Sequence, residues 1–393
     1  MNKPVSAHPV KVAWDVPDGH KWTGGVNYFI NLASALLSLP ERRVEPVVLD
    51  SGYPLPPPLN TFPILPKRIY KYANPASFLR HLWSKIPGPK KNTLGQILAD
   101  NAVDLYSHGK PLGPDYAVPS LSWIPDFQHI HLPSLFSEEE IQSRNKIFSD
   151  FARHARGILL SSECAARDFA RLYPAAVNKC HTLPFVACMA AGLLPEKSEI
   201  FTRYGLDEEF FLLPNQVWVH KNHRLVAAAL RILRSRGPCP LVVCTGATTD
   251  YRNPDFFNEL SAFTRQCGLE DRMRFLGSIP FSHVNLLMRE SIAIINPSLF
   301  EGWSTTVEEA KSLGKAILLS DLPVHREQAP ERGRFFDVED AEGLAALMSM
   351  TVKEQNPLAE RLFLEAAAEA RPLRVRDFAL RYENIVLACI RTR

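Results

Sequence analysis

Short apolar runs alternate with amphipathic stretches along most of this 393-residue chain, and no other feature constrains its fold as strongly. In the first half the runs are typical of strands, and the stretches between them have helical spacing. The strands are predicted at 10–16, 44–50, 103–108, 121–124 and 157–162, and the helices at 26–39, 137–155 and 162–172. Strands separated by crossover helices form a parallel sheet. The pattern therefore predicts an α/β fold.

The alternation starts afresh after residues 183–197, where prolines interrupt the periodicity. Strands are predicted at 210–214, 241–245, 273–276, 292–296 and 316–320, and helices at 222–235, 254–267, 281–289 and 306–313. A chain of this length exceeds what one hydrophobic core usually supports. We therefore predict two doubly wound domains, 1–190 and 191–373, followed by an amphipathic helix at 374–393 that packs on either of them.

Composition narrows the class of protein. With 46% hydrophobic and 22% charged residues and a net charge of +3, the chain has the composition of an ordinary globular protein. Its seven scattered cysteines show no C-x-x-C spacing, which predicts reduced thiols and neither a disulfide framework nor a zinc site. No apolar run is long enough to span a bilayer. We expect a cytoplasmic protein with no metal and no nucleic-acid partner.

The segment 51–99 departs from the rest because it contains no Asp or Glu but seven lysines and arginines among aromatic residues. A basic, aromatic surface suits an anionic membrane face or an acidic lipid-linked ligand, which predicts peripheral contact with the inner membrane face. A long proline-rich loop solvated by lysines explains the same composition.

Residues 300–310 stand between the strand predicted at 292–296 and the helix predicted at 306–313. In an open α/β sheet, ligands bind beyond the carboxyl ends of the strands, where helix N-termini offer N–H groups to phosphate. Glu301 and Glu309 stand eight positions apart across this corner. We interpret the segment as a ligand mouth in which both carboxylates accept hydroxyl groups.

An ordinary helix start explains part of the same segment. Thr305 with Glu308, or Thr306 with Glu309, fits the capping box that begins many helices. If Thr305 and Glu308 form the cap, Glu309 lies about 100° further round the helix and stays free for a ligand.

Three further groups follow predicted strands. Gly24 and Gly25 let the backbone approach a phosphate or sugar, although a plain turn also explains them. Lys221 follows the first strand of the second half and could neutralise a phosphate or merely be solvated. Asp126 and His129 could contact a reacting sugar or orient an acceptor hydroxyl, while a histidine that caps the next helix is the alternative.

Together, the Glu-x7-Glu pair of Glu301 and Glu309, the Gly24-Gly25 loop and Lys221 resemble the family-4 retaining glycosyltransferases of GT-B fold. The resemblance covers nearly the whole chain and is strongest at 212–330. It implies two Rossmann-like domains that face each other across a cleft. The C-terminal domain would hold a nucleotide-sugar donor, and the last helix would cross back to the N-terminal domain.

The resemblance also implies roles for individual residues. Glu301 would hold the hydroxyls of the donor sugar, Glu309 the ribose hydroxyls, and Lys221 the leaving diphosphate. Gly24 and Gly25 would close the phosphate site from the opposite domain. The remaining donor-binding residues are Gly246 and the loop residues Gly302, Trp303, Ser304, Thr305 and Thr306. Such enzymes use no cofactor, because the nucleotide sugar is a co-substrate.

The chain departs from the family pattern at two positions. The family usually places an arginine five positions before its lysine, where this chain has Gln216, which brings no charge. Many relatives carry His-Asp where this chain has Pro125-Asp126, so His129 is the nearest substitute for the sugar-facing histidine.

The favoured hypothesis is a retaining glycosyltransferase that acts on a saccharide or lipid-linked acceptor in surface polysaccharide or glycolipid assembly. A glycoside hydrolase also uses paired carboxylates but needs no phosphate-binding loops. A catalytically silent nucleotide-sugar sensor, or partner of another transferase, is the non-enzymatic alternative. A dinucleotide dehydrogenase is disfavoured because neither half opens with the expected glycine triplet.

Overall fold

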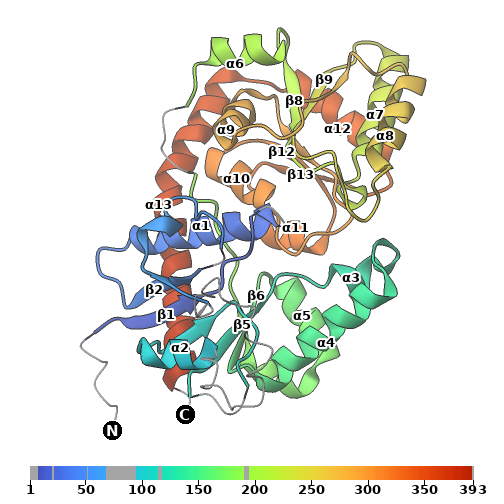
Figure 1. Cartoon of the computed structure of the whole chain (residues 1–393). Helices are drawn as coiled ribbons and strands as arrows, with labels where there is room; N and C mark the ends of the chain where they lie inside the picture. Colours follow the sequence, from blue (N-terminus) through green and yellow to red (C-terminus); the bar gives the residue numbers. More distant parts are fainter. Residues whose placement is uncertain are drawn as a thin grey trace, which may run out of the picture.

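The computed structural model describes residues 8–19, 22–50, 52–67, 94–113, 117–189 and 194–391, with the side chain of Thr23 left out. Two α/β units, each with its own parallel sheet, are stacked one above the other (Figure 1). The predicted α/β fold is therefore confirmed. Most of the basic segment lies outside the described residues, and the predicted boundary near residue 190 falls beside the undescribed positions 190–193.

The N-terminal sheet has seven parallel strands in the order β3-β2-β1-β4-β5-β6-β7. They are β1 (Val10–Trp14), β2 (Val44–Leu49), β3 (Ile64–Leu65), β4 (Leu105–Ser107), β5 (Ser120–Ile124), β6 (Gly157–Leu160) and β7 (Cys180–Thr182). The helices are α1 (Thr23–Leu37), α2 (Leu94–Asp100), α3 (Gln128–His131), α4 (Glu138–His154) and α5 (Glu163–Leu172). The strand order reverses between β1 and β4, and ligands of such sheets bind at the carboxyl edge beside this reversal.

The C-terminal sheet has six parallel strands in the order β10-β9-β8-β11-β12-β13. They are β8 (Phe210–Leu213), β9 (Leu241–Cys244), β10 (Met273–Phe275), β11 (Ile294–Asn296), β12 (Ile317–Ser320) and β13 (Gly333–Phe336). The helices are α6 (Lys197–Tyr204), α7 (His223–Arg236), α8 (Phe256–Gln266), α9 (Phe281–Glu290), α10 (Thr305–Leu313), α11 (Pro323–Gln328) and α12 (Ala341–Lys353). Separate apolar cores cover the two faces of this sheet, which is why its central strands read as continuous apolar runs.

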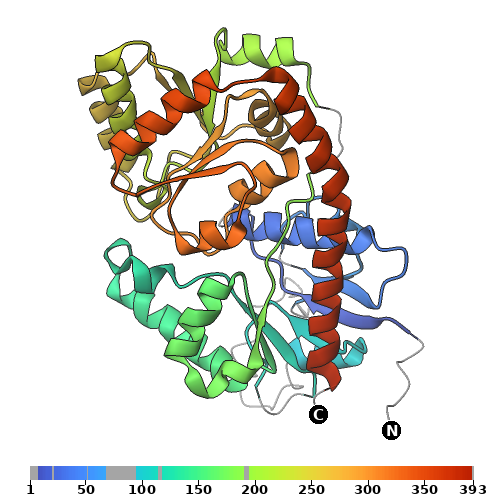
Figure 2. The ribbon, with the colours of Figure 1, turned by 180° about the vertical axis from the view of Figure 1, so that it is seen from behind.

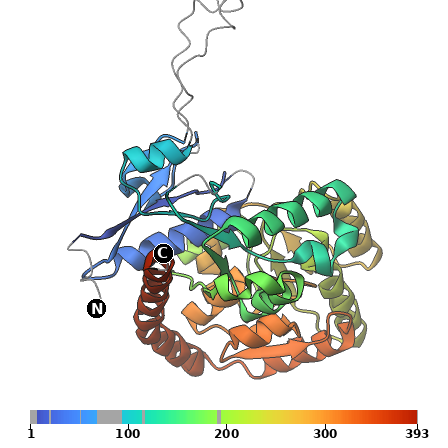
Figure 3. The same cartoon turned by 90° about the horizontal axis from the view of Figure 1, so that it is seen from below.

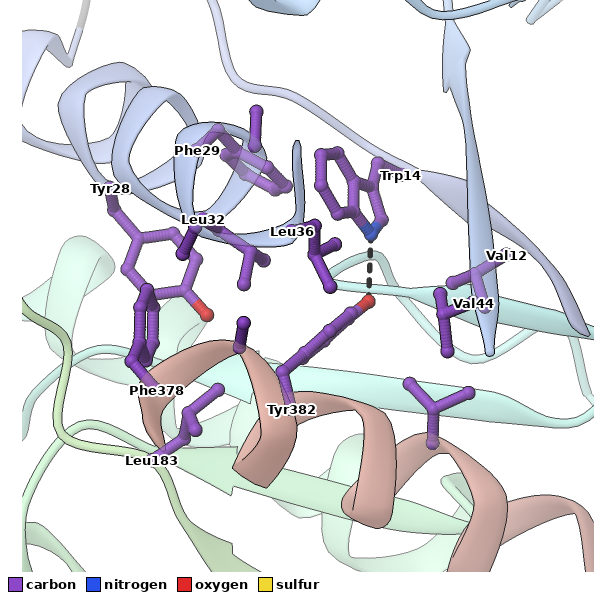
Figure 4. Close-up of a cluster of buried hydrophobic side chains, with 14 of the residues drawn as sticks. Val12, Trp14, Tyr28, Phe29, Leu32, Leu36, Val44, Leu183, Phe378 and Tyr382 are labelled. Atoms are coloured by element: carbon purple, nitrogen blue, oxygen red, sulfur yellow. Dashed lines mark hydrogen bonds between the residues drawn. The ribbon is translucent and has the colours of Figure 1, made fainter. Parts of the chain in front are cut away.

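The last helix, α13 (Pro357–Arg391), connects the two units. It begins against α10 of the C-terminal domain and ends along α1 of the N-terminal domain, as Figure 2 shows from behind and Figure 3 from below. Its second half fills the N-terminal core, where Trp14 donates from Nε1 to the Tyr382 hydroxyl over 2.7 Å (Figure 4). The buried Glu383 accepts hydrogen bonds from the amides of Arg43 and Val44. The C-terminal helix thereby belongs to both domains.

Candidate functional site

A buried ion pair stands at the carboxyl edge of the C-terminal sheet. Lys221, in the turn after β8, donates from Nζ to Glu301 Oε1 over 2.6 Å, and the two side chains are only 16% and 10% exposed. The Ser298 hydroxyl donates to the same oxygen over 2.7 Å. Burial alone would raise the pKa of Glu301, but the Lys221 ammonium and the Ser298 hydroxyl hold it below its ordinary value. Glu301 is therefore an ionised carboxylate with one oxygen already occupied.

A network of neutral side chains fixes this corner from behind. Asn215, after β8, donates to Asn296, at the end of β11, over 3.0 Å. Asn296 donates in turn to the Ser304 hydroxyl over 2.8 Å, and Thr306 donates to Asn215 over 3.0 Å. All four side chains are buried. The strand ends and the first turn of α10 are thus held in one arrangement.

Helix α10 begins differently from either capping alternative in the sequence. Its N-cap is Ser304, whose hydroxyl accepts from the amide of Val307, and neither Thr305 nor Thr306 caps the helix. Glu308 is committed elsewhere, because its carboxylate accepts from Lys311, Gln328 and Arg374. The capping explanation therefore accounts for neither Glu301 nor Glu309.

Glu309 is the other carboxyl of the pair, and its surroundings are the opposite of those of Glu301. The residue is 8% exposed, and no hydrogen bond or ion pair to its carboxyl occurs within the part of the chain that the structure describes. Burial raises its pKa to about 8. Glu309 is thus a protonated carboxyl at neutral pH, free to exchange hydrogen bonds with a ligand.

Gln216 and Gly246 lie together beside this corner. Gly246 follows β9 with a φ of +109°, and a Cβ at this position would stand 2.7 Å from the carbonyl oxygen of Asn215 and 2.8 Å from Cα of Gln216. Only glycine fits such an approach in that backbone region. Gln216 has a buried Oε1 with no hydrogen-bond partner among the described residues. Gly246 therefore lets the chain after β9 pass close to the backbone of Asn215 and Gln216.

The loop of Glu301 touches the N-terminal domain. A Cβ on Gly302 would stand 2.4 Å from the carbonyl oxygen of Pro125 and 2.7 Å from Cβ of Asp126. The next residue, Trp303, donates from Nε1 to the carbonyl of Phe185 over 3.0 Å. The structure thus brings Asp126 beside the glutamate loop, across the boundary between the domains.

His129 lies in a different environment from Asp126. Its ring is 1% exposed and packs against Phe136 and Phe148, and its Nε2 bonds to Asn145 over 3.0 Å. Burial lowers its pKa, so the ring is neutral. The structure places His129 inside the aromatic core of the N-terminal domain, and a contact with a sugar would require this packing to open.

Gly24 and Gly25 open α1, whose N-terminal end lies toward α10 and α11 (Figures 1 and 2). The indole of Trp22 covers them, because a Cβ on Gly25 would stand 2.5 Å from the Trp22 ring. Trp22 stacks in turn on Trp123, with ring centroids 5.0 Å apart. Gly25 therefore makes room for an aromatic side chain, which the sequence did not indicate, whereas a Cβ on Gly24 would stand 3.4 Å from Nε1 of Trp22 in ordinary contact.

Sequence reasoning missed three polar residues at this edge. Arg252 and His220 contact each other over 3.2 Å beside Lys221, and His325 lies behind Glu301 with an unpartnered, buried Nε2. His220 is the neighbour of Lys221 in the sequence, whereas no motif or spacing indicated a role for Arg252. Its position in a loop 32 residues further along the chain follows only from the fold.

The described part of the chain shows neither a metal-binding cluster nor a membrane-spanning helix. No group of three His, Cys, Asp or Glu side chains there could hold a metal ion. None of the helices in the described ranges combines the length and apolar character needed to cross a membrane.

Comparison with known proteins shows what this chain is similar to. The family model of glycosyl transferases group 1 matches residues 196–368. A glycosyltransferase from Rickettsia africae superposes with a TM-score of 0.68 at 16% identity, covering 98% of this chain and all of the other. HepE from Anabaena, in complex with UDP and glucose, gives 0.64 at 14% identity, covering 97% and 100%. The chain therefore has the GT-B fold, and its residues 196–368 are similar to glycosyl transferases group 1.

One similar sequence and one similar structure are named for O-antigen or lipopolysaccharide. The O-antigen chain mannosyltransferase RfbU of Salmonella typhimurium is 25% identical over 120 residues. That match spans 30% of this chain and about a third, 32%, of RfbU. WaaG, a glycosyltransferase involved in lipopolysaccharide biosynthesis, superposes with a TM-score of 0.57 at 14% identity, covering 97% of this chain and 98% of WaaG.

Proposed function

We propose that this protein is a retaining glycosyltransferase that moves a sugar from a nucleotide-sugar donor to an acceptor hydroxyl. One observation carries the proposal: an ionised, lysine-paired Glu301 and a buried, unpartnered Glu309 flank the N-terminus of α10 at the carboxyl edge of the sheet. The loop between them touches the N-terminal domain at Pro125. Acceptor and donor can therefore meet at this corner from opposite domains.

Each group has a chemical task in the transfer. Glu301 accepts hydrogen bonds from the hydroxyls of the donor sugar, and Glu309 exchanges them with the ribose. The free amides of Thr305 and Thr306 in the first turn of α10 and the Lys221 ammonium bind the diphosphate, whereas the Ser304 amide already donates to Gln328 over 3.1 Å. The bond from the sugar C1 to the phosphate oxygen breaks, and its electron pair stays on the diphosphate. The acceptor oxygen bonds to C1 on the same face and passes its proton to the leaving phosphate, without a metal or other cofactor.

The comparisons support a choice of substrates within this proposal. HepE was solved with UDP and glucose, and RfbU is named for mannosyl transfer to O-antigen chains. We therefore place this chain in the assembly of a surface polysaccharide or glycolipid. It would work in the cytoplasm on a saccharide or lipid-linked acceptor at the inner membrane face.

Replacing Glu301 with alanine tests the function. We expect E301A to lower donor turnover on the order of 100-fold or more, the scale of losing one preorganised polar group at a reacting centre. Release of nucleoside diphosphate from UDP, GDP and ADP sugars measures the turnover, and thermal melting confirms that the variant is folded. E339Q provides the control, because Glu339 is exposed and its replacement leaves the side chains of the site unchanged.

The outcomes separate the alternatives. Full turnover in folded E301A would remove Glu301 from its assigned role. Wild-type protein that binds a nucleotide sugar but releases no nucleoside diphosphate, with any saccharide acceptor, would be a sensor or a silent partner. Release of a sugar from a saccharide without any nucleotide would indicate a hydrolase instead.

A further inference from the structure

The loop after β9 carries an arginine that is almost completely buried. The Arg252 side chain is 7% exposed and forms an ion pair with Asp250, which is 1% exposed, over 3.1 Å. Its guanidinium also lies 5.0 Å from the centre of the Trp218 ring. A buried ion pair is costly to form and adds little net stability, so its place in the fold calls for an explanation other than stability.

Arg252 contacts the other domain as well. Its Nη1 donates to Gln128 Oε1 over 3.2 Å, and its guanidinium lies 5.5 Å from the centre of the Phe136 ring. Gln128 and Phe136 belong to the N-terminal domain, beside the buried His129. The side chain therefore lies between the two domains at the same edge as Lys221.

The contact between Arg252 and His220 determines which ring nitrogen of His220 carries the hydrogen. A guanidinium has only N–H donors, so the Nη2 of Arg252 donates to Nδ1 of His220 over 3.2 Å. The neutral imidazole then carries its hydrogen on Nε2. Burial, together with the charges of Lys221 and Arg252, lowers the pKa of His220 to about 2, so the ring is neutral at any working pH.

The Nε2–H of His220 is available to a ligand. This nitrogen has no hydrogen-bond partner among the described residues, and it is not fully buried. It therefore reaches accessible space. The His220 carbonyl accepts from the amide of Leu299 over 2.8 Å, which ties it to the loop that ends in Glu301. A neutral donor thus stands next to the Lys221 ammonium at the proposed donor site.

We propose that His220, held by Arg252 as the Nε2–H tautomer, donates a hydrogen bond to the diphosphate of the nucleotide donor. The inference deepens the proposed function and rests on it. His220 contacts the ligand, whereas Arg252 is a positioning residue that acts through His220 and Gln128. A neutral donor serves a leaving diphosphate well, because it needs no counter-charge before the ligand arrives.

Binding of UDP, GDP and ADP, each compared with its monophosphate, tests the proposal by calorimetry. We expect H220F to weaken the preferred diphosphate about tenfold, the size of one hydrogen bond to a charged group, and to weaken the monophosphate less. H220Q places an amide N–H near the lost Nε2–H and should retain most of the affinity. H283F is the matched control, since His283 bonds to Tyr204 within the C-terminal domain.

A second readout separates positioning from general structural support. In nitrogen-15 spectra, His220 of the wild type should appear as the Nε2–H tautomer and should not titrate between pH 6 and pH 8. R252M removes the donor to Nδ1, so we expect both tautomers and a weaker diphosphate complex. R272M, which breaks the ion pair with Glu208 instead, should change neither.

Two results would overturn the inference while leaving the proposed function in place: diphosphate affinity unchanged in H220F, or His220 found as the Nδ1–H tautomer in the wild type. If the wild type binds no nucleoside diphosphate and turns over no nucleotide sugar, the proposed function itself fails.

Discussion

At the scale of single residues, two buried glutamates eight positions apart have opposite electrostatic states. Glu301 lies 2.6 Å from the Lys221 ammonium and is ionised, whereas Glu309 has no partner among the described residues and is protonated at neutral pH, with a pKa of about 8. The difference comes from the neighbours, since burial acts on both. The Glu301 carboxylate can therefore accept hydrogen bonds from two hydroxyls, whereas the protonated Glu309 carboxyl can also donate one.

The raised pKa of Glu309 makes a prediction about stability. The folded protein keeps a proton that the unfolded chain loses above a pKa of about 4.5, so the unfolded state is favoured as pH rises from about 4.5 to about 8. E309Q removes this dependence. Between pH 5 and pH 8 we expect the wild type to lose free energy of unfolding relative to E309Q, by up to about 1.4 kcal/mol per pH unit.

Urea unfolding of both proteins at several pH values measures this difference. Below about pH 4.5 the difference between the two should no longer change with pH, because both side chains are then neutral in the folded and unfolded states. Parallel curves across the whole range would show that Glu309 is ionised in the folded protein.

The sequence could predict the edge of the sheet on which the site residues lie, but not their contacts. Lys221 and Glu301 each follow an apolar strand, so parallel topology places both at one edge. Their contact joins positions 80 residues apart, and the partner of a charge depends on the packing of intervening elements. For the same reason the sequence did not reveal that Arg252 reaches His220, or that the Trp22 ring covers Gly25.

At the scale of elements, the predicted strands are confirmed because long apolar runs between turn residues suit a sheet that is buried on both faces. The last helix differs from its prediction, since α13 begins at Pro357 instead of residue 374. Its first half exposes Leu358 and Leu362 and contains Pro372, so no apolar stripe marks it as a helix. The sequence also did not predict the strands β3, β7 and β13 or the helices α2, α3, α6, α11 and α12.

The second half of α13 should stabilise the N-terminal domain through Tyr382. This fully buried hydroxyl accepts from Trp14 Nε1 and donates to Ser107 over 3.2 Å. Y382F leaves the Trp14 N–H buried without a partner, which costs about 2 kcal/mol. We expect the melting temperature to fall by roughly 5 °C for a domain of this size.

Thermal melting followed by circular dichroism measures the change. Y53F is the control, because Tyr53 is 46% exposed, and its loss should alter stability by less than about 0.5 kcal/mol. If Y382F melts like the wild type, the hydrogen bonds of Tyr382 add nothing to the hold of apolar packing and Glu383 on α13.

At the scale of the whole molecule, the domains touch across the proposed donor site through contacts of different kinds. Glu327 of α11 accepts from the amides of Glu163 and Cys164, at the N-terminus of α5, over 2.7 and 3.0 Å. Phe300 stacks on His131 with ring centroids 5.0 Å apart. A carboxylate at a helix N-terminus is favourable because it satisfies free amides and opposes the helix dipole. The two domains are thus held in direct contact.

Weakening the Glu327 contact should open this arrangement. E327Q keeps the shape of the side chain but removes the charge that α5 attracts, worth about 1 kcal/mol at a partly exposed helix end. We expect a larger radius of gyration by small-angle X-ray scattering without ligand, and a severalfold higher KM for the donor. The kcat should change little, because Glu327 lies outside the reacting groups. E331Q, at an exposed position four residues further on, should alter neither quantity. An unchanged radius together with an unchanged KM would mean that the remaining contacts, Phe300 with His131 and Arg252 with Gln128, suffice to hold the domains together.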